Sequence, residues 1–240
     1  MKKPVLPPPD SFASCPQAGS VLDYYAGVFS AVYVTLSPFL APVSAASLAL
    51  FDPSDPEADP SKMAVAAHFR PVRWRDVAQA CGLPNLAAVD IALRTGIHGL
   101  AEVYRNEDHL ARVRTLYASD GLLPPTEGQH SELLQDEVLR LFQELGHDWV
   151  WVGDEFCAER QLYRIDDIRN GAVDPFTTGC NVFAPDQSLL WTVHWDSHFS
   201  FLCAASEAAL KSVQIEARLE GFFCRPGTDV YWSTTRTGPE

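Results

Sequence analysis

The sequence is poor in positive charge. Its 240 residues include 18 Lys and Arg against 31 Asp and Glu, which gives a formal net charge of −13. Nucleic-acid-binding proteins owe most of their affinity to clustered Lys and Arg side chains that contact phosphates. The shortage of basic residues therefore argues against a nucleic-acid partner. An acidic balance of this size favours a basic protein partner, or serves solubility alone.

Long uninterrupted apolar runs are also missing. The first long apolar stretch, residues 28–50, contains Pro38 and Pro42 together with several hydroxyl side chains. A membrane-spanning helix needs about 20 predominantly apolar residues. At the N-terminus, Pro4 and Pro7 interrupt the apolar run that a signal peptide requires. We therefore expect a cytoplasmic protein with no membrane-spanning segment.

Closely spaced cysteines and the common catalytic motifs are absent. The six cysteines stand far apart, at positions 15, 81, 157, 180, 203 and 224, with no Cys-x-x-Cys pair. This spacing does not support a zinc knuckle or a thioredoxin-like motif. The chain also has no phosphate-binding Gly-x-x-x-x-Gly-Lys loop and no Gly-x-Ser-x-Gly elbow. Because a chain of this length buries a core without disulfides, we expect the cysteines to be buried, free thiols.

The first part of the chain favours helices. Residues 1–20 are Pro-rich and predict an extended arm, and residues 52–60 form an acidic, Pro-rich loop. Gly82 and Gly146 stand where helix C-termini are expected, and Thr126 with Gln129 fits a capping box. The predicted helices cover residues 21–50 with a break at Ser37-Pro38, then 62–69, 74–81, 86–96, 102–117 and 133–145.

The pattern changes after Gly146, where aromatic and β-branched residues dominate short runs. The predicted strands are residues 149–152, 161–165, 179–183, 188–195, 199–203, 221–224 and 229–232, with a hairpin turn at 185–187 and a short helix from Ser206. Helices followed by strands predict the α+β class, a helical N-terminal part packed on a mainly antiparallel sheet. We expect an arm at 1–20, one domain at 21–235 and a tail at 236–240.

The richest cluster of polar residues is His194-Trp195-Asp196-Ser197-His198. In a strand, His194, Asp196 and His198 would share one face and offer imidazole and carboxylate ligands for zinc or iron. A straight strand would separate the two histidines by about 13 Å, so a single ion requires a bend. A turn at Asp196-Ser197 would supply the bend, and it would equally make the segment an ordinary hairpin end.

Acidic loops and aromatic residues suggest a different use of the same region. Asp154 and Glu155 follow a predicted strand and could work as a catalytic carboxylate pair, although acidic loops are expected in a chain this acidic. Tryptophan is a large core residue that is also enriched at interfaces. The residues we expect to contact a partner are Trp195, Asp196, His198, Asp154 and Glu155.

One segment has the spacing of a helix-turn-helix. Residues 76–83 place Ala78 four positions before Gly82, with an apolar residue next. The second helix would carry no basic residue before Arg94, whereas a recognition helix presents such residues to bases and phosphates. We therefore interpret this pair of helices as structural.

Several short segments resemble a known family. Residues 34–40 and 71–76 are similar to the opening of an uncharacterised bacterial family of unknown function. Residues 195–199 and 219–224, with Thr228 and Trp232, look like the ends of that family and of some toxin-immunity proteins. The resemblance implies no catalytic residues.

Two function hypotheses follow. The first is an acidic, non-enzymatic, immunity-like protein that neutralises a basic protein partner and needs no cofactor. The second is a metal-dependent hydrolase with zinc or iron at His194, Asp196 and His198, where the metal would activate water.

Overall fold

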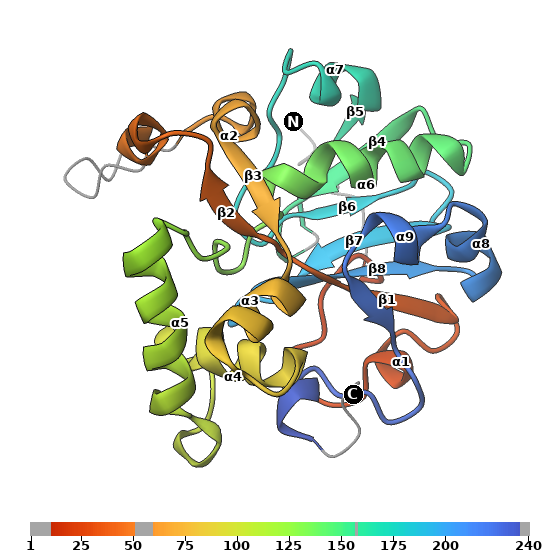
Figure 1. Ribbon diagram of the computed structural model, residues 1–240. Coiled ribbons are helices and arrows are strands. Elements are labelled where there is room, and N and C mark those ends of the chain that lie inside the picture. The colour runs from red at the N-terminus through yellow and green to blue at the C-terminus, as the bar shows by residue number, and fades with distance from the viewer. Residues whose placement is uncertain (1–10, 51–59, 157, 236–240) are drawn as a thin grey trace, which may run out of the picture.

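A seven-stranded antiparallel sheet forms the centre of the molecule (Figure 1). The computed structural model describes residues 11–50, 60–156 and 158–235. The strand order is β5-β4-β6-β7-β8-β1-β9, and helices lie on both faces, which confirms the α+β class. The strands are β1 Ala31–Leu36, β4 Trp149–Gly153, β5 Arg160–Arg164, β6 Asn181–Phe183, β7 Leu189–Val193, β8 Phe199–Ala204 and β9 Gly221–Phe223.

Strand β1 lies inside the sheet, although it comes from the first part of the chain. It pairs with β8 on one side and β9 on the other. The prediction of helix over residues 21–50 is therefore wrong there, apart from α1 (Val21–Tyr24) and a 3₁₀ segment. All six residues of β1 are buried, and its β-branched valines suit a strand covered on both faces. The predicted break is confirmed, because β1 ends at Leu36 and β2 (Phe39–Pro42) begins after Pro38.

Helices α3 (Trp74–Cys81), α4 (Leu86–Gly96) and α5 (Glu107–Asp120) belong to the layer on one face of the sheet. Trp74 and Val89 share a hydrophobic cluster with Phe201 of β8. The Trp74 indole also donates a hydrogen bond to the carbonyl of Ser37 at 2.6 Å. This bond satisfies the polar atom of a fully buried tryptophan and ties α3 to the end of β1.

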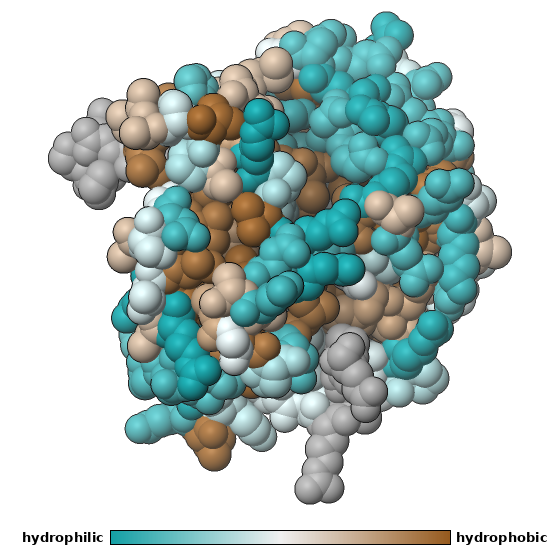
Figure 2. Space-filling model, viewed as in Figure 1, coloured by the Kyte–Doolittle hydropathy of each residue, from teal (hydrophilic) through white to brown (hydrophobic). Residues whose placement is uncertain are grey.

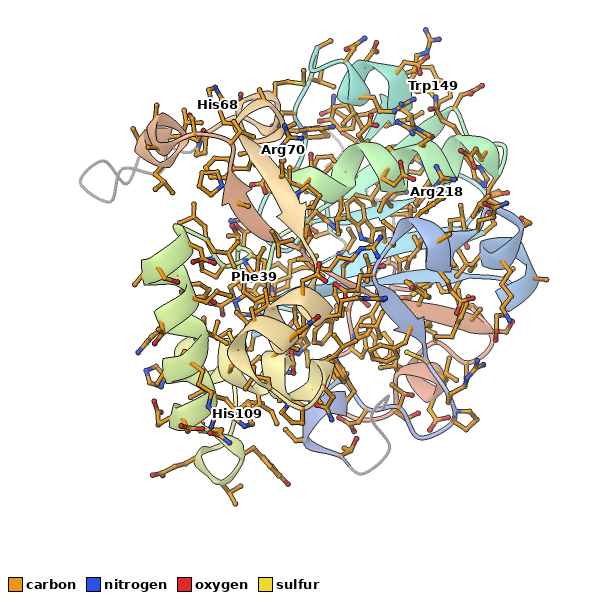
Figure 3. The ribbon with its side chains drawn as sticks, in the orientation of Figure 1. Phe39, His68, Arg70, His109, Trp149 and Arg218 are labelled. Carbon is orange, nitrogen blue, oxygen red and sulfur yellow. The ribbon has the colours of Figure 1, made fainter. Side chains whose placement is uncertain are left out.

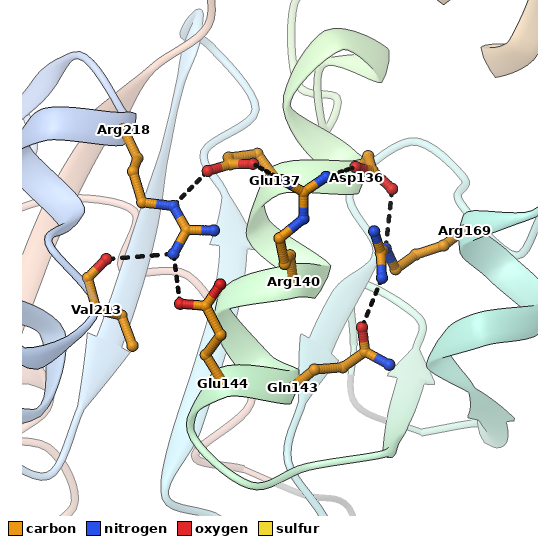
Figure 4. Close-up of polar contacts among 8 residues, drawn as sticks. All are labelled: Asp136, Glu137, Arg140, Gln143, Glu144, Arg169, Val213 and Arg218. Atoms are coloured by element: carbon orange, nitrogen blue, oxygen red, sulfur yellow. Dashed lines mark hydrogen bonds and ion pairs between the residues drawn. The ribbon is translucent and has the colours of Figure 1, made fainter.

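The other face is covered by α6 (Glu132–Glu144), α7 (Ile165–Arg169), α8 (Glu207–Ser212) and α9 (Ile215–Arg218). Val138 and Phe142 of α6 are fully buried against the cluster that contains Trp191. Figure 4 shows the polar contacts on the outer side of α6. Arg218 binds Glu137 and Glu144, while Arg169 binds Asp136 and Gln143. These contacts connect α6 to α9 and α7.

A small two-stranded sheet, β2 with β3 (Phe69–Val72), projects beside the main sheet with α2 (Lys62–His68). Leu40, Val65 and Phe69 form a separate small core there. Figure 2 shows hydrophilic residues over α6 and α7, and a group of hydrophobic residues between this small sheet and α5.

Most predicted elements form near their expected positions. Helices α2, α3 and α4 agree with the sequence patterns, and Gly82 adopts the left-handed conformation (φ 63°) that ends α3. The capping box at Thr126 is wrong, because α6 begins at Glu132 after Ser131. The predicted helix at 102–117 begins later, at Glu107, after a 3₁₀ turn. The predicted strand at 229–232 is a turn and a 3₁₀ helix with one isolated bridge at Asp229.

Several predicted segments lie outside the described residues, and most of the described cysteines are buried. Residues 1–10 of the predicted arm, the acidic loop at 51–59 and the tail at 236–240 lie outside the described residues. Residues 11–19 form turns and bends that bury Ala13 in the main core. Five free cysteines are described: Cys180, Cys203 and Cys224 are buried, and Cys15 and Cys81 are partly exposed. No described helix has both the length and the apolar character that crossing a membrane requires.

Glu220 caps α3 from a distant part of the chain. Its carboxylate accepts hydrogen bonds from the backbone N–H groups of Trp74 at 2.6 Å and Arg75 at 3.0 Å. Its side chain is 5% exposed, so these bonds are shielded from water. The residue before α3, Arg73, makes no side-chain cap. A carboxylate at a helix N-terminus satisfies free donors and interacts favourably with the helix dipole.

We expect Glu220→Gln to lower the free energy of unfolding by about 1–2 kcal/mol, since it removes the charge and one acceptor oxygen. Urea titration monitored by circular dichroism measures this change. The control is Glu216→Gln, an exposed position on α9, for which we expect a change within about 0.5 kcal/mol. Equal effects of the two substitutions would contradict the capping role.

Candidate binding site at the β7–β8 turn

His194–His198 forms the turn that joins β7 to β8. Val193 pairs with Ser200, so the five residues between Val193 and Phe199 lie outside the ladder. The Ser197 hydroxyl donates to the carbonyl of His194 at 3.0 Å and closes the turn. The hairpin-end alternative is therefore the one that the structure adopts.

The turn separates its side chains into two groups. His194 and His198 are 1% and 4% exposed, and they point into the protein. Trp195 and Asp196 are exposed at the surface. The alternation expected of a straight strand does not occur, because the chain reverses its direction within these residues.

Three glycines allow other segments to approach this turn closely. Gly128 donates its N–H to the carbonyl of Ser197 at 3.1 Å. A Cβ atom on Gly99 would lie 2.9 Å from the carbonyl oxygen of Asp196, and one on Gly179 would lie 3.1 Å from the Trp195 indole nitrogen. Side chains at these positions would push the turn outward, so the glycines fix its place in the fold.

A buried ion pair lies behind the turn. Arg94 and Asp90 of α4 are both fully buried, with Nη1 and Oδ2 3.8 Å apart. Ser233 donates a hydrogen bond to the same Asp90 oxygen at 2.5 Å. The Arg94 guanidinium lies over the Tyr231 ring, 4.3 Å from its centre. Arg94 is thus a fixed positive charge inside the protein.

Burial and this charge keep the two histidines neutral. Desolvation, together with the charge of Arg94, lowers the pKa of His194 to about 4 and that of His198 to about 3. The Nδ1 atoms of both rings have no hydrogen-bond partner within the described part of the chain. Their positions suit core packing behind the turn more than contact with a partner.

The predicted metal ligands do not form a group. In residues 11–50, 60–156 and 158–235, no three His, Cys, Asp or Glu side chains come together in a way that fits a metal ion. Asp196 is exposed, whereas His194 and His198 are buried near Arg94, whose charge opposes a cation. The geometry therefore gives the zinc or iron hypothesis no support.

The exposed side of the turn borders a pocket of about 250 Å³, called the Trp195 pocket below. Trp195 is 37% exposed and Phe156 is 76% exposed. The pocket unites two predicted binding residues, Trp195 and Glu155, although 40 residues separate them in the sequence. It is lined by Cys15, Gln17, Glu155, Phe156, Gly179, Asn181, Val193 and Trp195.

Asp154 and Asn181 support this pocket. The Asp154 carboxylate accepts hydrogen bonds from the backbone N–H of Ala158 at 2.8 Å and of Glu159 at 3.3 Å. Its carbonyl accepts a bond from the Asn181 amide at 3.0 Å, and Asn181 also bonds with Thr192 of β7. Asp154 therefore orders the loop that carries Glu155, instead of lining the pocket as a partner-binding residue would.

The surroundings of the pocket are acidic. Burial, followed by the negative charge of Asp196, raises the pKa of Glu127. Glu127 precedes Gly128, whose N–H donates to the carbonyl of Ser197, so Glu127 and Asp196 lie near the same turn. Glu155 adds a further carboxylate in the pocket itself. An exposed indole among carboxylates favours a cationic group.

The sequence patterns missed Cys15, Gln17 and Asn181. Each comes from a segment with no recognisable motif, and only the pairing of β6 with β7 and the path of residues 11–19 bring them to Trp195. Arg94 was also missed as a neighbour of the turn, because α4 is some 100 residues away in the sequence.

Because these buried histidines are neutral, we expect the stability of the protein to fall in acid. The unfolded chain binds protons on these histidines below about pH 6.5, whereas folded His198 does so only near pH 3. The stability that depends on these neutral histidines is therefore fully present above about pH 6.5, and it is lost as the pH decreases. Near pH 5 we expect His198 to contribute about 1.4 kcal/mol of this loss per pH unit.

Denaturant titrations between pH 7.5 and pH 4.5 test this expectation. His198→Gln should reduce the pH slope by about one proton. His68→Gln is the control, because His68 is exposed on α2 (Figure 3), and it should leave the slope unchanged. A slope that His198→Gln does not alter would show that His198 is not buried in its neutral form.

One protein-family model matches almost the whole of the described fold. A family model described as "Protein of unknown function (DUF2711)" matches residues 17–234. Searches of curated proteins and of solved structures gave no match. The matched range contains the whole sheet, the β7–β8 turn and every lining residue of the Trp195 pocket except Cys15. The resemblance to a family of unknown function is thereby confirmed, and the chain belongs to the DUF2711 family.

Proposed function

We propose that this protein binds a basic protein partner, and that the Trp195 pocket receives a Lys or Arg side chain of that partner. The observation that carries the proposal is the grouping of Trp195 and Phe156, two exposed aromatic rings, with the carboxylate of Glu155. Aromatic faces and carboxylates together form a site for a cation.

The energetics of such a site suit an interface. A cation over an indole contributes about 0.5–2 kcal/mol, depending on how far it is desolvated. Tryptophan and arginine are enriched among the few residues that dominate binding energy. The pocket is large enough, at about 250 Å³, to take the end of one long side chain. Trp195 is thus the proposed anchor of the interface.

The overall charge supports the same proposal at long range. A net charge of −13 attracts a basic partner and raises the rate of encounter, with a strong dependence on salt. We propose that its biological role is to neutralise a basic protein in the bacterial cytoplasm, as immunity-type proteins do for toxins. The short segments that resemble such proteins include the β7–β8 turn itself.

Peptides that differ at one central position test the pocket. We expect peptides with Arg or Lys to bind more tightly than the same peptide with norleucine, and more weakly as salt is raised. Trp195→Ala and Glu155→Gln should each weaken binding about tenfold or more. Isothermal titration calorimetry gives these affinities.

Trp149→Ala is the matched control. Trp149 is 46% exposed on β4 (Figure 3). It is not among the residues that line the pocket. Its replacement should leave peptide affinity unchanged. Equal binding of the norleucine peptide, or equal losses from Trp149→Ala and Trp195→Ala, would refute the proposed pocket.

A further inference from the structure

A second, smaller cavity lies where α2 meets the beginning of α6. Its volume is about 60 Å³, and it shares no lining residue with the Trp195 pocket. It is lined by Pro60, Lys62, Gln129, His130, Glu132, Gln135, Asp174, Phe176 and Thr177. Seven of these nine residues are polar, and Lys62, His130 and Gln135 among them are buried.

Lys62 is the only lining residue with a positive charge. The residue is 8% exposed, and its ammonium nitrogen has no hydrogen-bond partner among the described residues. Burial lowers the pKa of this amine, while the negative charges of Asp136 and Asp174 act in the opposite direction and Arg169 acts with burial. A buried ammonium without a hydrogen bond is costly, so a negatively charged group beside it would be stabilising.

The N-terminus of α6 adds to this preference. This 13-residue helix begins at Glu132, and Ser131 before it makes no side-chain cap. The Ser131 hydroxyl also has no partner among the residues that the structure describes. The free N–H groups and the dipole of a helix N-terminus favour a carboxylate. Lys62 and α6 thus create one place for an anionic group.

Three further lining residues, His130, Gln135 and Asp174, offer acceptor atoms. His130 uses Nε2 to donate to the carbonyl of Cys180 at 3.0 Å, and burial lowers its pKa to about 3, so Nδ1 carries a lone pair. Gln135 donates its amide N–H to the carbonyl of His130, which leaves its Oε1 without a partner in the described part of the chain. The Asp174 carboxylate, one oxygen of which accepts a hydrogen bond from the backbone N–H of Phe176 at 3.3 Å, completes this set. Such a set favours a donor with positive charge.

We propose that this cavity binds a small zwitterion of the size of glycine. The ligand's carboxylate would lie at Lys62 and the start of α6, and its ammonium group at Asp174 and Gln135. The volume of about 60 Å³ is about four times the roughly 15 Å³ that one water needs, which suits a ligand of about five non-hydrogen atoms. A zwitterion satisfies both the unpaired ammonium and the excess of acceptors, whereas a simple anion or cation satisfies only one of them.

Calorimetry and ligand-observed NMR with glycine test the proposal. We expect glycine to bind in the millimolar range or tighter, and acetate and methylamine to bind about tenfold more weakly or worse, because each lacks one charged group. Lys62→Met and Asp174→Asn should each reduce glycine affinity about tenfold or more. Circular dichroism confirms that both variants are folded.

Lys211→Met is the control, since Lys211 is exposed on α8 and pairs with Glu207. It should leave glycine binding unchanged. Absence of glycine binding would show that the cavity holds only water. Acetate or methylamine binding as tightly as glycine, or an equal loss from Lys211→Met, would also overturn the proposal. None of these outcomes affects the proposed partner binding at Trp195.

Discussion

The need to bury both faces of the central sheet determines the rest of this structure. Every residue of β1, β7 and β8 is buried, so each face requires its own layer of helices. Helices α3, α4 and α5 supply most of one layer, and α6, α7, α8 and α9 supply the other. Because neither face is open, the Trp195 pocket lies at strand ends, where turns leave the covered layers, and the cavity at Lys62 lies between α2 and α6.

The β7–β8 turn lies at the end of two strands, and its polar residues form a buried group and an exposed group. His194 and His198 turn inward toward Arg94 and remain neutral, whereas Trp195 and Asp196 reach the surface. The inward group packs behind the turn, and the outward group is the one that we propose contacts a partner. With this separation, His194, Asp196 and His198 do not form a group of metal ligands in the described structure. One five-residue segment therefore has a structural half and an exposed half.

The two proposed sites use polar groups in different ways. The larger Trp195 pocket combines an exposed indole with the carboxylate of Glu155, and we propose that it takes the end of a long cationic side chain. The smaller cavity at Lys62 contains three buried side chains with an unpartnered polar atom among the described residues, Lys62, His130 and Gln135, and we propose that it takes a compact ligand with both charges. Both sites draw residues from elements far apart in the sequence, which is why no local motif marks either of them.

The sequence by itself determined the α+β class, helices α2, α3 and α4, the break at Ser37-Pro38 and the positions of most strands. These features follow from local periodicity, glycine and proline, which act within a few residues. It did not determine that β1 lies between β8 and β9, since a buried apolar run is compatible with either helix or strand until a partner strand is present. Nor did it determine which face of the β7–β8 turn His194 and Asp196 would occupy. That choice depends on Arg94 and on three glycines from distant segments, contacts that exist only in the tertiary structure.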